Sequence, residues 1–238
     1  MNGAARLLVS ALGASGLCAF AAFVILGRPP EYSAPSGRAA VSLGRGEYFM
    51  EGGAVFRSLP GGGAEKAAEI PPEITPADFA FLDGRLYVSD AFKKRVYCLL
   101  PSGGKVWESS GADRFAVPNF RFALDISPEG DLWVANPGRG RIEKLDKATG
   151  KFIASWTPLK KFAFAGCCNP TEFAALAGGK FATMEKGSRL MRVFSPDGAC
   201  VYSSPVSELW GSYELRAHAD GEGFEFSDGV RTGSVGAE

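Results

Sequence analysis

Histidine is nearly absent from this chain, because His218 is the single one among 238 residues. One imidazole excludes a histidine-rich zinc centre, and no Cys-x-x-Cys precedes it, which excludes a covalently attached haem. A Ser-His-Asp triad would have to recruit this residue from the weakest part of the repeat described below, so histidine-based catalysis is not expected. No glycine-rich phosphate loop occurs either, because Gly138-Arg139-Gly140 falls between two predicted strands and not before a helix.

Net charge is also absent, since 26 Lys and Arg residues balance 26 Asp and Glu residues. A neutral chain has no overall field that attracts nucleic acid, so no nucleic-acid partner is expected. The short basic clusters at 93–95 and 160–161 are interpreted as solvated turns. With 46% apolar residues, 31 glycines and 15 prolines, the composition is typical of a globular domain with many short strands and tight turns.

One long apolar run stands at the N-terminus, where residues 7–27 carry no charge and are flanked by single arginines. A cleaved signal peptide has an apolar core of about 7–15 residues, whereas a helix needs about 20 residues to cross a bilayer. The run therefore predicts an uncleaved N-terminal transmembrane helix within 1–28, with a cleaved signal as the alternative. Residues 29–38, rich in proline and serine, are typical of a spacer. We expect a single-pass cell-membrane protein whose main domain, 39–238, lies on the extracytoplasmic side, periplasmic or extracellular.

A repeated pattern runs through this main domain. Each copy has a glycine turn, an alternating apolar strand, an acidic or amide residue, a short loop and a second strand. The clear copies begin at Gly84, Gly130 and Gly179. Weaker copies begin at Gly46 and Gly223, so that the lead glycines are 38, 46, 49 and 44 residues apart. Periods of this length indicate one supersecondary unit per copy.

Each clear copy also has one apolar strand before it and another after it, as 79–82 and 105–107 do around the copy at Gly84. Alternation with period two between glycine turns predicts four-stranded antiparallel units. Such units, repeated every 40–50 residues or so, are typical of an all-β fold, the β-propeller. We predict about five four-stranded antiparallel blades, with six as the alternative. The first strand of a blade lies near the crowded axis, which suits the small residues found there: Ala80, Ala123, Ala174 and Ala175.

Residues 122–136, followed by Arg141 and Ile142, resemble the NHL repeat of bacterial β-propeller proteins. The resemblance extends from Gly46 to the C-terminus and is strongest over residues 76–207. It implies a propeller with commonly six blades, whereas the length of this chain favours five. The resemblance implies no particular activity.

An acidic or amide residue ends the glycine-led strand in every copy: Glu51, Asp90, Asn136, Glu185 and Asp228. These residues would either form a ring of functional carboxylates or accept turn amides, as Asx-turn residues do. A pattern repeated in every blade favours the structural interpretation. Arg95 and Arg141, five residues after Asp90 and Asn136, are then predicted to tie the turn to the next strand.

The segment Cys167-Cys168-Asn169-Pro170 interrupts the repeat, in the loop that leads into a first strand. Three interpretations remain open: structural disulfides, a redox or soft-metal site, and buried free thiols. Because proline restricts the residue before it to extended geometry, the two sulfur atoms are expected to point in different directions. The cysteines available for thiol or disulfide chemistry in the domain are Cys98, Cys167, Cys168 and Cys200.

Polar residues precede the first strands at what the repeat makes equivalent positions. A concave channel mouth with convergent polar groups is the default ligand site of such a fold, although solvated loops are also charged. The predicted ligand-binding residues of the mouth are Asp78, Arg121, Asn169, Glu172 and Glu214. Nearby aromatic residues are expected to form either pocket walls or core: Phe120, Phe162 and Phe164.

The missing catalytic set favours a non-catalytic binding or scaffolding propeller, without a cofactor, that presents its loops to a protein, peptide or glycan outside the membrane. Two alternatives remain. The first is a metal-dependent hydrolase or lyase, in which Asp78, Asn169 and Glu172 would imitate the calcium ligands of lactonase-like propellers. The second is a thiol- or metal-handling accessory protein that uses Cys167 and Cys168.

Overall fold

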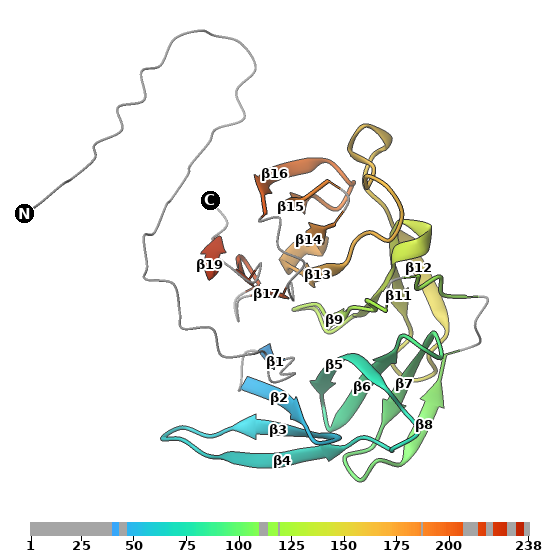
Figure 1. Cartoon of the computed structure of the whole chain (residues 1–238), viewed down its shortest axis with the longest axis vertical. Coiled ribbons are helices and arrows are strands. Elements are labelled where there is room, and N and C mark those ends of the chain that lie inside the picture. The colour runs from blue at the N-terminus through green and yellow to red at the C-terminus, as the bar shows by residue number, and fades with distance from the viewer. Residues whose placement is uncertain are drawn as a thin grey trace, which may run out of the picture.

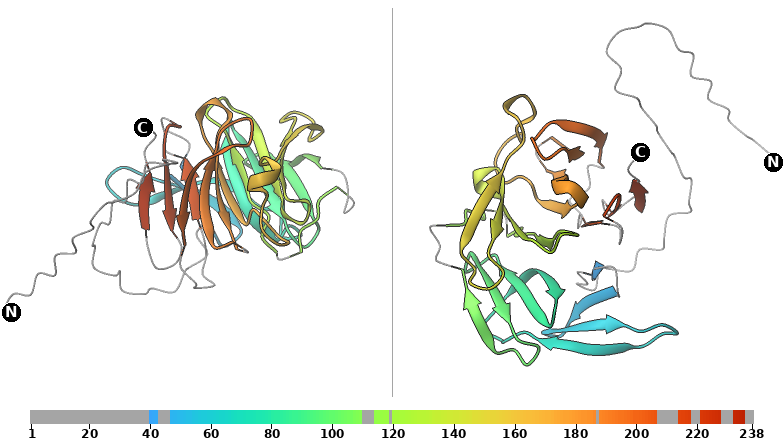
Figure 2. Two further views of the ribbon diagram at one scale, coloured as in Figure 1. Left: turned by 90° about the horizontal axis from the view of Figure 1, so that it is seen from above. Right: turned by 180° about the vertical axis from the view of Figure 1, so that it is seen from behind.

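The computed structural model describes residues 40–42, 47–109, 114–118, 120–186, 188–206, 214–217, 221–227 and 232–235. These residues form nineteen strands and three short 3-10 turns, η1 (Pro137–Arg139), η2 (Lys160–Phe162) and η3 (Ala177–Gly179). The strands make five antiparallel sheets arranged around a common centre (Figure 1). Seen from the side, the strands cross the thickness of the ring (Figure 2).

Each sheet is a meander in chain order. The first contains β1 (Ala40–Ser42), β2 (Glu47–Glu51), β3 (Ala54–Ser58) and β4 (Ala64–Glu69). The second contains β5 (Pro76–Leu82), β6 (Arg85–Asp90), β7 (Arg95–Leu99) and β8 (Lys105–Glu108). The third contains β9 (Leu124–Ile126), β10 (Leu132–Asn136), β11 (Arg141–Leu145) and β12 (Phe152–Trp156). The fourth contains β13 (Glu172–Ala175), β14 (Phe181–Glu185), β15 (Leu190–Phe194) and β16 (Cys200–Pro205), and the fifth β17 (Glu214–Ala217), β18 (Phe224–Ser227) and β19 (Thr232–Val235).

The first strands of the five sheets line the centre. They contact one another in the order β1, β5, β9, β13 and β17, and β17 contacts β1. This arrangement is a five-bladed β-propeller, and it confirms the predicted all-β fold. The fifth sheet has three described strands, which agrees with the short last copy of the repeat.

The predicted transmembrane helix (1–28) and spacer (29–38) lie outside the described residues. Within the part of the chain that the structure describes, no helix has both the length and the apolar character needed to cross a membrane.

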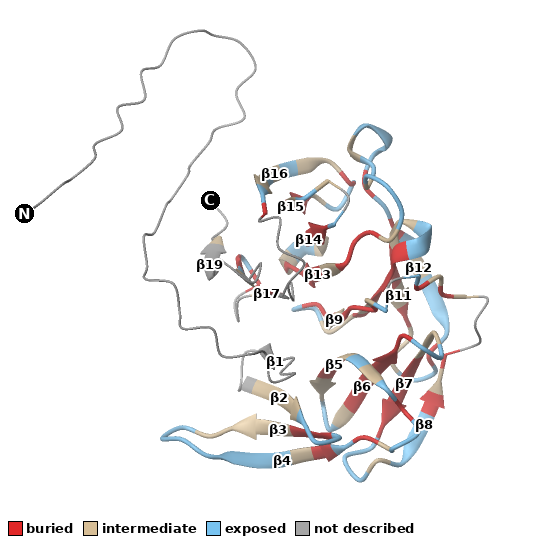
Figure 3. Ribbon diagram, in the orientation of Figure 1, coloured by how far each residue is buried: buried red, intermediate tan, exposed pale blue. Residues whose placement is uncertain are grey.

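Many residues of the strands are buried (Figure 3). The buried apolar residues form four core clusters, each of which joins two consecutive blades. The predicted small residues belong to these interfaces, since Ala80 and Ala174 are fully buried. They are small because adjacent blades approach closely near the axis, where a larger side chain would overpack the interface.

Tryptophans on the outer strands link neighbouring blades. Trp107 Nε1 donates a 2.8 Å hydrogen bond to the carbonyl oxygen of Lys147 in the β11–β12 turn of the next blade, and Trp156 Nε1 donates a 3.0 Å bond to that of Pro196 in the β15–β16 turn. Each indole spans forty residues of sequence. These bonds fix the angle between consecutive blades at their rims.

The recurring acid or amide proves structural wherever its side-chain bonds are described. Asp90 accepts hydrogen bonds from the backbone N–H groups of Thr75 (3.0 Å) and Lys93 (2.8 Å). Asn136 accepts one from Ala116 (2.9 Å), and Glu185 pairs with buried Arg192 at 2.5 and 2.6 Å. These contacts confirm the structural interpretation at three positions, while Asp228 lies outside the described residues.

Arg95 and Arg141, which were predicted to tie the turn to the next strand, form different ion pairs. Arg95 pairs with Glu108 of β8, which ties the hairpin to the next strand as expected. Arg141 pairs at 2.6 Å with Glu143 of its own strand, so it supports the turn without reaching β12.

Candidate functional site

One face of the ring carries the beginnings of the innermost strands together with the β6–β7, β10–β11 and β14–β15 hairpins. We call it the entry face. Three of the predicted mouth residues occupy equivalent places there: Asp78 pairs with Ser89, Glu172 with Met184 and Glu214 with Ser227.

Arg121 does not share that position. Ala123 is the equivalent residue in the third blade, because its carbonyl oxygen accepts the N–H of Ala135 at 2.8 Å. Arg121 therefore lies two residues before the strand position predicted for it, a shift that sequence spacing across loops of unequal length cannot reveal. Its guanidinium nevertheless reaches the mouth, where Nη1 lies 3.1 Å from Glu172 Oε1 in the next blade.

Asp78 also connects two blades. Its carboxylate accepts hydrogen bonds from its neighbour Phe79 (2.8 Å) and from the backbone N–H of Leu124 in the third blade (2.9 Å). Innermost strands have one edge without a strand partner, so a carboxylate from the preceding blade satisfies an N–H group there. Both mouth contacts, Asp78 with Leu124 and Arg121 with Glu172, therefore join consecutive blades.

Asp125 repeats this arrangement one blade further on and deeper in the ring. Its carboxylate accepts 2.8 Å bonds from the backbone N–H groups of Ile126 and of Ala175 in the fourth blade. Burial raises the pKa of Asp125 from its ordinary 3.8 to about 7; the two backbone bonds oppose this rise, and the charge of Asp78 adds to it. Atoms of the neighbouring strands enclose the carboxyl group, while the residue as a whole is partly exposed.

Sequence reasoning treated Asp125 only as part of a strand. One signal was present: it stands where the equivalent strands have the small apolar residues Ala80 and Ala174. The register shows this equivalence, because Ala80 pairs with Tyr87, Asp125 with Trp133 and Ala174 with Ala182. A carboxyl group whose pKa is close to neutrality can both take up and release a proton at neutral pH, which a general base or acid requires.

Asn169 has a structural role in place of the predicted ligand contact. It is fully buried, its Nδ2 donates to the carbonyl oxygen of Ala165 at 2.6 Å, and its Oδ1 accepts the N–H of Lys186 at 2.9 Å. The amide thus clamps the loop that leads into β13. A residue with both ends of its amide engaged inside the protein does not line the mouth.

The four cysteines of the domain are free thiols in this structure. Cys98 is buried in the interface between the second and third blades, and Cys200 Sγ donates to the carbonyl oxygen of Tyr202 at 3.1 Å. Cys167 is exposed and Cys168 half-buried, with their Sγ atoms 3.1 Å apart. The expectation that these sulfurs point apart is wrong, because Cys168 has φ +73° and alternation of side chains holds only in extended backbone.

The predicted aromatic residues divide between surface and core. Phe120 is 60% exposed and packs against Phe92, itself 65% exposed, with ring centroids 4.8 Å apart. This exposed pair lies on the entry face next to Arg121. Phe162 and Phe164 instead pack against the core between the third and fourth blades.

A metal centre does not fit the described residues. No group of three or more His, Cys, Asp or Glu side chains in the described part of the chain is placed to hold a metal ion. Asp78 and Glu172 are each committed to blade contacts, and Asn169 is buried. The predicted calcium set therefore does not come together.

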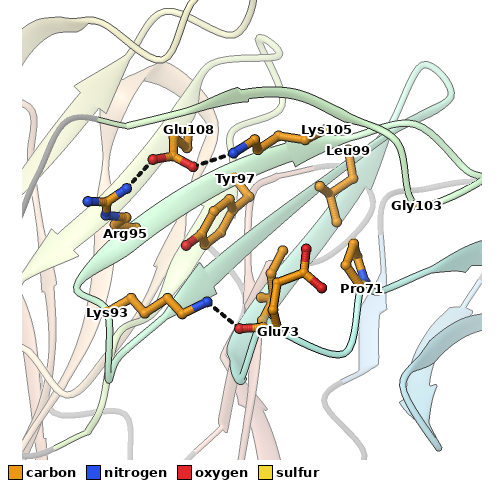
Figure 4. A pocket seen from close by; sticks show the side chains of 10 residues that line it. Pro71, Glu73, Lys93, Arg95, Tyr97, Leu99, Gly103, Lys105 and Glu108 are labelled. Carbon is orange, nitrogen blue, oxygen red and sulfur yellow. Dashed lines mark hydrogen bonds and ion pairs between the residues drawn. The ribbon is translucent and has the colours of Figure 1, made fainter.

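A groove of about 520 Å³ lies away from the mouth, between the segment before β5 and the outer strands β7 and β8 (Figure 4). Its charged groups have partners within the groove: Glu108 accepts from Lys105 at 2.6 Å and also pairs with Arg95, while Lys93 donates to the carbonyl oxygen of Glu73. The pKa of Glu108 is lowered by Lys105 and Arg95, and burial raises the pKa of Tyr97, so both groups are moved away from titration near neutrality. The entry face, with Asp125, is the stronger candidate site.

Comparisons with known proteins agree with the fold. No protein-family model matches the chain, and no curated protein matches it either. Among solved structures, a catalytically inactive histidine-to-alanine variant of virginiamycin B lyase from Staphylococcus aureus with quinupristin is similar, with 16% identity, TM-score 0.54, and coverage of 87% of this chain and 69% of that chain. A streptogramin B lyase shows 14% identity, TM-score 0.52, and coverage of 85% and 67%.

A gluconolactonase from Xanthomonas campestris is also similar, with 17% identity, TM-score 0.53, and coverage of 81% of this chain and 68% of that chain. At such identities the likeness establishes the fold, a β-propeller, and does not single out the NHL type. The chain spans about two thirds of the length of these proteins.

The interpretation of the chain as a non-catalytic binding module is contradicted by these comparisons, because the similar propellers are lyases and a gluconolactonase. The reason for the error is physical. The activity of a propeller depends on a few side chains on loops and strand ends, and the overall composition of the chain does not reveal them.

Proposed function

We propose that this chain is an enzyme of the hydrolase or lyase class whose reacting group is the carboxyl of Asp125. The observation that carries the proposal is the position of this carboxyl on a partly exposed residue of an innermost strand, where burial raises its pKa to about 7. The likeness to lyase and gluconolactonase propellers supports the same class of reaction.

The proposed step is proton transfer. Above its pKa, Asp125 accepts a proton from water in hydrolysis. In hydrolysis of a lactone, the hydroxide so formed attacks the carbonyl carbon, the ring C–O bond breaks, and the proton passes from Asp125 to the departing oxygen. In elimination it accepts the proton from the carbon atom adjacent to the one that carries the leaving group; a C=C bond forms, the bond to the leaving group breaks, and the proton passes from Asp125 to the departing group.

The entry face would bind the rest of the substrate. Arg121, oriented by Glu172, supplies positive charge at the mouth, and the exposed rings of Phe92 and Phe120 supply an apolar surface. Arg121 lies four residues before Asp125, so their backbones are separated by at most about 13 Å. A macrocyclic ester or lactone fits this span.

The test is a screen of small lactones and macrocyclic esters with the wild-type chain and the variant Asp125→Asn. We expect turnover of a macrocyclic substrate, a rate that rises with pH to a plateau above about 7, and a loss of about a hundredfold or more in the variant. Asp131→Asn is the matched control. Asp131 lies in the β9–β10 turn, away from the entry face, and pairs with Lys144 of β11. Undiminished turnover by Asp125→Asn would refute the proposal, as would a wild-type chain inactive on every member of the screen.

Two finer assignments also remain proposals. Kinship with NHL-type propellers is supported by the resemblance of residues 122–136. A single-pass anchor within 1–28 that places the propeller outside the cytoplasm is supported by the uncharged run at 7–27. Cell fractionation with N-terminal sequencing tests the anchor, which a soluble product lacking this run would exclude.

A further inference from the structure

Two adjacent thiols stand apart from the proposed reaction. Cys167 and Cys168 lie in the loop between β12 and β13, with their Sγ atoms 3.1 Å apart. In an extended chain, neighbouring side chains point to opposite sides. Here Gly166 (φ +72°) and Cys168 (φ +73°) both have left-handed backbone geometry, which brings the two side chains together.

The loop geometry is held by neighbouring groups and not by the thiols themselves. Asn169 clamps the loop through Ala165 and Lys186, at 2.6 and 2.9 Å. A non-glycine residue such as Cys168 adopts positive φ only at an energetic cost, so the surrounding contacts maintain a conformation that the chain alone would not favour. The pair is thus preorganised.

The two sulfurs differ in exposure and hydrogen bonding. Cys167 is exposed, whereas Cys168 is half-buried and its S–H donates to Cys167 Sγ. Burial raises the pKa of Cys168, the neighbouring Cys167 raises it further, and Lys186 opposes this. The exposed, hydrogen-bond-accepting sulfur of Cys167 is therefore the one that a reagent meets first.

Two competing roles are disfavoured. A structural disulfide is not formed, because the four described cysteines are free and neither Cys98 nor Cys200 is bonded to this pair. A closed metal site needs more ligands than two sulfurs, and no third acidic, cysteine or histidine ligand joins them among the residues that the structure describes. Oxidation to a disulfide needs only the two sulfurs.

We propose that Cys167 and Cys168 form a thiol–disulfide exchange site whose substrate is a low-molecular-weight disulfide, RS–SR. The Cys167 thiolate attacks one sulfur of the substrate, the S–S bond of the substrate breaks, and one RS⁻ leaves with a proton. The Cys168 thiolate then attacks Cys167 Sγ in the mixed disulfide and releases the second RS⁻, which takes the second proton. The protein dithiol is oxidised to a Cys167–Cys168 disulfide and RS–SR is reduced to two RSH.

The geometry suits the second step. The sulfurs start 3.1 Å apart, and a disulfide needs about 2.05 Å, so the exposed side chain of Cys167 and the half-buried side chain of Cys168 must approach by about 1 Å to complete the bond. Capture within the same loop is faster than exchange with a second substrate molecule, because the attacking sulfur is already held next to its target.

The test uses the reduced full chain and oxidised glutathione, with remaining thiols alkylated at timed intervals. After trypsin digestion, the peptide 162–180 contains Cys167 and Cys168 and neither of the other two domain cysteines. We expect this peptide to become resistant to alkylation and about 2 Da lighter, without retained glutathione, as an intramolecular disulfide requires.

Variants separate the two roles. Cys168→Ser should accumulate one glutathione on Cys167, because the resolving thiol is missing. Cys167→Ser should react at least about tenfold more slowly, because the remaining thiol is partly buried and has a raised pKa. Cys200→Ser is the control, and its 162–180 peptide should be oxidised at the wild-type rate.

Several results would overturn the site. These are full alkylation of both thiols after excess oxidised glutathione, glutathione retained on both cysteines, and a bond from either cysteine to Cys98, Cys200 or a second chain. Equal rates for Cys167→Ser and Cys168→Ser would overturn the assignment of the attacking sulfur. None of these outcomes depends on the activity proposed for Asp125.

Discussion

At the scale of the residue, the inner strands show how one substitution within a repeat changes its chemistry. Ala80 and Ala174 only fill space between blades, whereas Asp125 at the same register carries a carboxyl group into that space. Two backbone N–H groups stabilise its charge, but burial outweighs them and raises its pKa. The position therefore combines a structural link to Ala175 with a group that titrates near neutrality.

This pKa predicts how stability depends on pH. Between the ordinary value of 3.8, which applies to the unfolded chain, and about 7, the folded state holds a proton on Asp125 that the unfolded state has lost. The free energy of unfolding therefore falls as pH rises through this window, and this contribution is constant above it. Urea unfolding from pH 4 to 8 should show a decline that is smaller in Asp125→Asn. Parallel pH profiles for the two proteins would contradict the assignment.

At the scale of the element, three hairpins on the entry face, β6–β7, β10–β11 and β14–β15, have a third-strand residue at the same register position that the repeat pattern did not reveal. Tyr97, Glu143 and Arg192 occupy equivalent positions, since they pair with Val88, Val134 and Thr183. The recurring acid or amide beside them was predictable from its spacing. The partners of this residue were not predictable. In the third blade Asn136 contacts Glu143, which also pairs with Arg114 at 2.5 Å across 29 residues. In the fourth blade the third-strand residue is a cation, Arg192, and it pairs with Glu185.

The rim contact between the second and third blades predicts a specific steric effect. A Cβ atom on Gly150 would lie 2.5 Å from the ring of Trp107, at a backbone φ of +70°. Gly84 has a similar φ of +68° in the β5–β6 turn, with nothing within 4 Å of a Cβ atom there. Gly84→Ala should cost about 1 kcal/mol from backbone strain alone, and Gly150→Ala a further 1–3 kcal/mol or so from overpacking.

Urea unfolding with tryptophan fluorescence measures both variants in the same buffer. Since Trp107 donates its indole N–H to Lys147, a displaced ring should also change the emission of folded Gly150→Ala. Equal destabilisation of the two variants would show that Trp107 moves aside without cost, and that this contact does not hold the blades together.

At the scale of the whole molecule, the fold was the most predictable property and the site the least. Glycine spacing and alternating strands recur along the chain, so the β-propeller and its five units follow from local pattern. The mouth depends on contacts between blades, such as Asp78 with Leu124 and Arg121 with Glu172, which span 46 and 51 residues. The cysteine pair was recognisable because it interrupts the repeat, but its geometry depends on the positive φ of Cys168, which residue type does not indicate.

Closure of the ring is the property that no single blade determines. The four apolar clusters join consecutive blades from the first to the fifth, and contacts of β1 with β17 and β5 connect the two ends. β1 is also the partner of β2, through the pairs Ala40–Phe49, Val41–Tyr48 and Ser42–Glu47. Loss of this short strand would expose the inner edge of the first sheet and remove the described contact between the first and last blades.

Two truncations test the importance of β1. Removal of residues 1–38 leaves β1 intact, whereas removal of residues 1–46 deletes it together with its pairing to β2 and its contacts with β17. We expect the longer truncation to lower the melting temperature by about 5 °C or more relative to the shorter one, because unpaired backbone groups and an open ring both cost stability. Hydrogen exchange should increase in β2 and β17 in the same protein. Identical melting temperatures and exchange would mean that the ring is held by the blade interfaces alone, and that β1 does not close it.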